Sequence, residues 1–262
     1  MSRAVATAVA VVLSSAAFGQ GRGVSAGSPP AGSVAAPIDL TGYWVSLIVD
    51  EWRFRVSPQK GDLAYLPLNP DARQAANAWD PDKDTADNNQ CRAYGAVGLM
   101  QRPGRLHITW ENENTLRVDA DAGTQTRRVH FGAAPTDRGQ PSWQGYSTGE
   151  WQVPRGAALD LGGIGFVAGL GPGQRANRTG TLKIVTKNML PGYLRKNGVP
   201  YSSSATLTEY VNRLTGANGE AYVALTAMLD DARYLNQPFV RTYTFKQQPD
   251  ASGWAPTECL PR

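Results

Sequence analysis

Histidine and cysteine are scarce in this chain of 262 residues, which has only His107, His130, Cys91 and Cys259. A metal site needs three or four converging ligands. No C-x-x-C, H-x-H or H-E-x-x-H spacing occurs. We therefore expect neither a metal nor a cofactor, and we expect the two cysteines to pair with each other.

Runs of one charge are also missing. The formal net charge is +4, yet no run of lysine and arginine is longer than two residues. Interspersed charges do not form the basic patch of a nucleic-acid or anionic-membrane protein. We expect no nucleic-acid partner.

A long hydrophobic run is absent as well. Small and apolar residues fill positions 4–17, fewer than the roughly 20 that a membrane-spanning helix needs. With Arg3 before this run and Ala17-Phe18-Gly19 after it, the pattern is typical of a secretory signal peptide of residues 1–19. We expect no transmembrane segment in the mature chain, and export to the periplasm or beyond, where a Cys91–Cys259 disulfide would persist.

Composition divides the chain after the predicted signal peptide into two parts. Residues 20–37 are nearly all Gly, Ser, Ala, Pro and Val, which predicts a flexible leader. Residues 38–262 are long enough for one β-rich domain.

Alternating apolar and polar residues, rich in β-branched and aromatic types, predict short strands along this domain. The expected strands are 40–49, 52–56, 106–111, 115–120, 124–131, 142–151, 180–186, 205–211, 221–229 and 238–246. Three of them, within residues 106–131, form a meander. The count predicts an all-β fold, an antiparallel barrel or sandwich.

One short helix is expected after Asn69-Pro70, because asparagine caps helices and proline suits the first helical position. It should end before Asp80-Pro81, and the polar stretch to Gln90 should be an exposed loop. The glycine-rich stretch 156–180 has no phosphate-loop Lys-Ser/Thr and predicts a loop or insertion.

Four segments resemble a large group of exported bacterial proteins of unknown function, with motifs PGR, GxSxGxW, DxxGxPHS and DPxxYxxPW. They are GRLHI (104–108), GYSTGEW (145–151), KNGVPYS (196–202) and YLNQPF (234–239). Tyr201 stands where the group commonly has His, and Phe239 where it has Trp. The resemblance implies a β-rich exported protein, and Gly42-Tyr43-Trp44 resembles the start of lipocalins.

Acid–base chemistry has four candidate residues. His107 and Glu111 share one face of their strand, and His130 lies on a strand nearby, so all three could meet if that face lined a barrel lumen. If it faced solvent, they would be ordinary surface residues. Glu209 has apolar neighbours on its own face, which suits either a buried proton-transfer group or a partner for an arginine. Ser147 fits G-x-S-x-G, but the helix that a nucleophile elbow requires does not follow it.

Seven tryptophans and ten tyrosines could supply a ligand cavity. Our main hypothesis is a lipocalin-like barrel that binds a small, partly apolar ligand, lined by Trp44, Trp110, Tyr146 and Trp151. The alternatives are a cofactor-free enzyme for hydrolysis or proton transfer in the same cavity, and a cell-envelope interaction module without a pocket. A filled core would favour the last.

Overall fold

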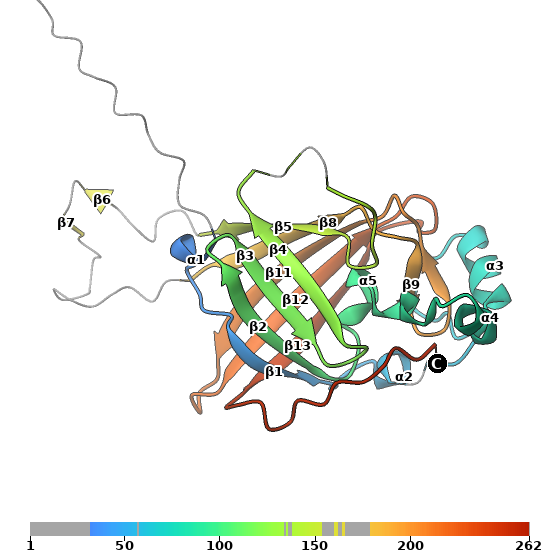
Figure 1. The fold of residues 1–262 in the computed structure, drawn as a ribbon, viewed down its shortest axis with the longest axis horizontal. Coiled ribbons are helices and arrows are strands. Elements are labelled where there is room, and N and C mark those ends of the chain that lie inside the picture. The colour runs from blue at the N-terminus through green and yellow to red at the C-terminus, as the bar shows by residue number, and fades with distance from the viewer. Residues whose placement is uncertain are drawn as a thin grey trace, which may run out of the picture.

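Nine strands close into a β-barrel (Figure 1). The computed structural model describes residues 32–56, 58–133, 135, 138–153, 160–161, 164–165 and 179–261. The barrel strands are β1 (Gly42–Leu47), β2 (Arg105–Asn112), β3 (Thr115–Ala120), β4 (Gln125–Phe131), β5 (Tyr146–Gln152), β8 (Thr181–Lys187), β11 (Thr206–Thr215), β12 (Ala221–Asp230) and β13 (Phe239–Gln248). Their order is β1-β13-β12-β11-β8-β5-β4-β3-β2. The predicted all-β barrel is confirmed.

Strand β1 closes the barrel, because it pairs with β13 on one side and β2 on the other. Every neighbouring pair is antiparallel except β4 and β5, which run parallel. The longest strands, β11, β12 and β13, pair through two successive antiparallel ladders. Closure leaves no barrel strand with an open edge.

Apolar side chains fill the barrel, because alternate residues of each strand point inward. Trp44 is completely buried there and donates its indole hydrogen to the carbonyl oxygen of Leu40 at 2.9 Å. The interior core comprises Leu40, Trp44, Leu99, Met100, Leu106, Ile108, Leu116, Val118, Ala120, Val129, Phe131, Leu182, Ile184, Val211, Val223, Leu225, Tyr243 and Phe245.

A second region, which we call the helical flank, lies at one side of the barrel (Figure 1). It comprises α2 (Trp52–Arg55), α3 (Pro70–Ala78), α4 (Pro81–Ala86), the 3₁₀ helix η1 (Gln90–Tyr94), α5 (Ala96–Leu99) and the two-stranded sheet of β9 (Gly192–Arg195) and β10 (Val199–Tyr201). Its own apolar core joins α3 and α5 to the ends of β11, β12 and β13, and includes Ala72, Ala76, Val97, Leu194, Val199, Leu207, Leu229 and Phe239.

The predicted helix after Asn69 is confirmed, and the Asn69 side chain accepts a hydrogen bond from the Ala72 backbone at 2.9 Å. Two other predictions for the flank are wrong. The expected strand 52–56 is helix α2, where Arg55 points inward and donates to the carbonyl oxygens of Leu47 and Gln101. The apparent alternation misled because it counted this buried arginine as surface.

The expected loop 80–90 is also wrong, because it contains α4 and the start of η1. Asp80 caps α4 and Pro81 occupies its first position, the same signal that predicted α3. A short polar helix has little apolar periodicity, so the Asp80-Pro81 cap was the sequence feature that could have predicted α4.

The C-terminal tail is attached to the body by the disulfide between Cys91 and Cys259, which confirms the predicted pairing. Residues 32–37 of the predicted leader also lie on the barrel, where α1 (Gly32–Ala35) accepts a hydrogen bond from the Trp151 indole through the Gly32 carbonyl oxygen. Residues 1–31, with the predicted signal peptide, lie outside the described residues. So does most of the stretch 156–180, of which the structure describes residues 179–180 and the strand pair β6 (Asp160–Leu161) and β7 (Ile164–Gly165). None of the described helices is long and apolar enough to cross a membrane.

Candidate functional site

The barrel interior has little free space. Its cavity has a volume of about 30 Å³ and is lined by core residues that include Leu116, Leu182, Val223 and Phe245. Ligand pockets usually measure about 300–1,000 Å³, and 30 Å³ matches one water molecule. A filled interior favours the interaction-module alternative over a ligand inside the barrel, so the ligand hypothesis needs a different location.

A polar network lies inside the barrel. Arg127 of β4 forms a two-pronged ion pair with Glu209 of β11, and it also donates hydrogen bonds to Ser147 at 3.1 Å and Thr186 at 2.7 Å. Arg127 and Glu209 are both at most 2% exposed. Glu209 thus has the arginine partner that the sequence left open, and Ser147 is a buried member of this network.

His107 lies on the outer face of β2. Its ring stacks on Tyr43, with centroids 4.1 Å apart, and Trp254 approaches its edge at 6.2 Å. Its strand neighbours Leu106 and Ile108 are the residues that enter the barrel core. His107 therefore faces away from Glu209.

Glu111 and His130 also lie outside the lumen. Glu111 accepts a 2.6 Å hydrogen bond from Arg128, which holds the pKa of its carboxyl below the usual value. Burial, followed by the nearby charge of Arg128, lowers the pKa of His130, whose ring stacks on Tyr146. The structure does not gather the four predicted acid–base residues into one cavity, because Glu209 is internal and the other three are external.

Three of the four predicted ligand-binding aromatics belong to the barrel core or pack against it, and the fourth lies outside. Trp44 is buried in this core, and the rings of Trp110 and Trp151 each contact Phe131, with centroid distances of 5.4 and 5.6 Å. Tyr146 lines an outer pocket of about 250 Å³ together with Arg138, Thr148, Val185 and Lys187.

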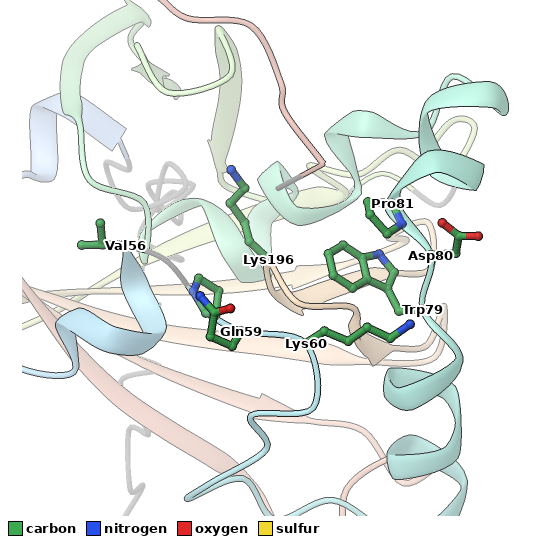
Figure 2. A pocket seen from close by; sticks show the side chains of 8 residues that line it. Val56, Gln59, Lys60, Trp79, Asp80, Pro81 and Lys196 are labelled. Carbon is green, nitrogen blue, oxygen red and sulfur yellow. The ribbon is translucent and has the colours of Figure 1, made fainter.

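A pocket of about 610 Å³ lies in the helical flank (Figure 2). We call it the flank pocket. Its walls come from the segment after α2, the corner between α3 and α4, and the turn between β9 and β10. It is lined by Val56, Pro58, Gln59, Lys60, Trp79, Asp80, Pro81 and Lys196.

Trp79 is the fixed wall of this pocket. Its indole nitrogen donates to Asp84 at 2.9 Å, and Asp84 also accepts from Arg92 and Tyr193. The indole lies against Gly198, where a Cβ atom would come within 2.1 Å of the ring and where φ is +78°. Only glycine suits both conditions.

The opposite wall is attached to the β9–β10 turn. Buried Asn197 donates to the carbonyl oxygens of Gln59 at 2.9 Å and Asp62 at 3.0 Å. Lys196, from the same turn, extends past the Tyr94 ring with its ammonium 5.5 Å from the ring centroid. Two lysines and one aspartate therefore give the lining a net positive charge.

None of the residues that line the flank pocket was among the predicted site residues. Their signals were weak: a cap at Asp80-Pro81 and a glycine at 198 that occurs in an N-G pair. Tyr201, where the resembled group has His, is 1% exposed within the flank core. Burial raises the pKa of its hydroxyl.

Comparison with known proteins finds no matching family model, curated protein or solved structure.

Proposed function

We propose that this protein is an exported binding protein that holds a small, partly apolar ligand with an acidic group in the flank pocket. The observation that carries the proposal is the contrast in volume: about 610 Å³ in the flank pocket against about 30 Å³ in the barrel. The first value lies within the usual range of ligand sites.

The lining indicates the ligand's chemistry. Trp79, Pro58, Pro81 and Val56 supply apolar surface, while Lys60 and Lys196 outnumber the single carboxylate of Asp80. Apolar walls with a few polar groups are typical of small-molecule sites, where the polar groups orient the ligand. A flat or apolar body with one carboxylate fits this lining.

Export follows from the predicted signal peptide of residues 1–19 and agrees with the disulfide, since such bonds persist outside the reducing cytoplasm. Enzymatic use of His107, Glu111, His130 and Glu209 would require them to share a site, and the barrel wall separates Glu209 from the other three.

Calorimetric titration with benzoate and indole-3-acetate, and with benzamide as the neutral comparison, tests the proposal. We expect the two acids to bind and benzamide to bind at least about tenfold more weakly, since one charge-assisted contact contributes about 1.5–3 kcal/mol. Lys60→Glu should abolish binding of the acids. Lys83→Glu makes the same charge change at an exposed position of α4 outside the lining and should have little effect. Equal losses in both variants would contradict a site in this pocket.

A further inference from the structure

Large apolar side chains are concentrated in solvent around α2. Val49, Trp52, Val56 and Tyr65 are 50% to 81% exposed and all lie within residues 49–65. The other exposed large apolar residues of the described chain are spread over much longer stretches of sequence. Contiguous exposed apolar surface often marks a binding site.

Two residues of this region have strained backbones. Glu51 has φ of 47° and Tyr65 has φ of 60°, and both belong to the left-handed region. Such a conformation is uncommon for ordinary residues and is an outlier for a bulky one like tyrosine. Strain of this kind persists only where the surroundings impose it, and it is concentrated at binding sites.

Arg241 of β13 imposes the conformation. Its Nε donates to both carboxylate oxygens of Glu51 at 2.9 Å, and Nη2 donates to the Tyr65 carbonyl oxygen at 3.3 Å. The Tyr65 ring meets the edge of Phe54, which the guanidinium of Arg195 covers at 4.0 Å. These contacts therefore hold the exposed aromatic residues of this region in place.

The apolar surface is continuous with the flank pocket. Trp52 and Val56 are four residues apart, and the Val56 backbone hydrogen bonds to the Trp52 carbonyl oxygen, so their side chains share one face of α2. Val56 also lines the flank pocket (Figure 2). A ligand that fills the pocket and passes Val56 would meet Trp52 next.

We propose that the ligand is a single-chain anionic amphiphile, whose acidic head lies in the flank pocket and whose hydrocarbon chain lies along Val56 and Trp52. This inference rests on the proposed function and names its ligand class. The positive lining of the pocket complements the head, and the exposed apolar strip complements the chain. We take the ligand to be the free molecule, and the vesicle experiment below distinguishes it from a membrane surface.

Titration of laurate and hexanoate, both below the concentrations at which they form micelles, tests this inference, because the two acids share a head and differ in chain length. We expect laurate to bind at least about tenfold more tightly, since each buried methylene contributes about 0.8 kcal/mol, and tenfold corresponds to about 1.4 kcal/mol. Trp52→Ala should weaken laurate about tenfold and leave hexanoate within about twofold, and Trp52→Phe should restore most of the loss. Leu214→Ala, at an exposed apolar residue of β11, is the matched control and should change neither affinity.

Equal affinities for laurate and hexanoate, or equal effects of Trp52→Ala and Leu214→Ala, would overturn the amphiphile inference and leave the pocket proposal standing. Failure of every acid to bind would overturn both. Binding to vesicles of phosphatidylglycerol is measured in addition. Binding to vesicles that requires Trp52, with no preference for laurate over hexanoate, would show a membrane surface in place of a free amphiphile.

Discussion

The barrel interior and the segment that joins α5 of the flank to β2 of the barrel differ in how fully their buried arginines are paired. Arg127 in the barrel has a carboxylate and two hydroxyl groups as partners. Arg102, in the joining segment, is 4% exposed, and among the described residues neither of its terminal nitrogens has a hydrogen-bond partner. Burial lowers the pKa of Arg102, and that of Arg195, to about 10.

This difference agrees with the proposal that the barrel supports the fold while the flank binds the ligand. The barrel pairs its buried Arg127 with Glu209 and fills its interior, so it serves as a rigid scaffold. The flank contains Arg195, whose Nη2 has no hydrogen-bond partner among the described residues, together with strained Glu51 and Tyr65 and the 610 Å³ pocket. Departures from local rules of this kind often mark binding sites, which agrees with the proposed ligand site in the flank pocket.

The largest effect should come from Arg127→Met. It leaves Glu209 buried without its partner, which should lower the free energy of unfolding by about 3–5 kcal/mol. Urea unfolding followed by circular dichroism measures the loss. A loss below about 1 kcal/mol would show that this pair is not the barrel's main polar constraint.

Removal of the disulfide should have the next largest effect, because the bond joins η1 of the flank to a tail that lies along the barrel. Thr257 in this tail exchanges hydrogen bonds with Asp121 and Thr124. The double variant Cys91→Ser/Cys259→Ser should lose about 2–4 kcal/mol in urea unfolding. An unchanged unfolding midpoint would mean that these hydrogen bonds hold the tail without the bond.

Gly198→Ala should damage the flank more than the barrel. Its left-handed backbone costs about 1–3 kcal/mol with a side chain, and the Trp79 indole must also move. Gly219→Ala is the control, because φ there is +81° but no atom lies within 4 Å of the added methyl group. We expect ligand binding to be lost only in Gly198→Ala. If both variants bind alike, the indole does not form the pocket wall.

Arg102→Met should change stability in the opposite direction from Arg127→Met. An apolar side chain of similar length removes an incompletely paired buried charge, and such exchanges are neutral or stabilising by about 1–4 kcal/mol. Thermal unfolding of the two variants side by side gives the comparison. A destabilised Arg102→Met variant would show that this charge stabilises the fold.

The smallest effect concerns an exposed pair on the barrel surface. A hydrogen bond from Lys246, followed by those from Tyr222 and Asn218, lowers the pKa of Glu220 to about 2. Because the folded-state value is depressed, this contribution to stability is present above the usual carboxyl pKa and is lost as the pH falls toward 2. Carbon-detected NMR titration should show the value rise in Lys246→Ala and, through screening, in high salt. A value that responds to neither change would contradict the ion pair.

Sequence patterns predicted the barrel better than the site. Period-two alternation located the barrel strands, because one face of each is buried and the other is solvated. The same pattern could not show that His107 faces outward or that the lumen is full, since both depend on closure between distant strands such as β1 and β13. The flank pocket combines segments from residues 56–60, 79–81 and 196, and no local signal connects them.

The most direct test of the central claim is an amide and methyl NMR titration with laurate, which reports on the flank and the barrel interior in one experiment. Our account predicts shift changes at Trp52, Val56, Lys60, Trp79 and Lys196, with the lumen residues Leu182, Ile184 and Val223 unchanged. Changes confined to the lumen residues would contradict it, because they would show that the barrel opens to take the ligand and that the flank pocket is not the site.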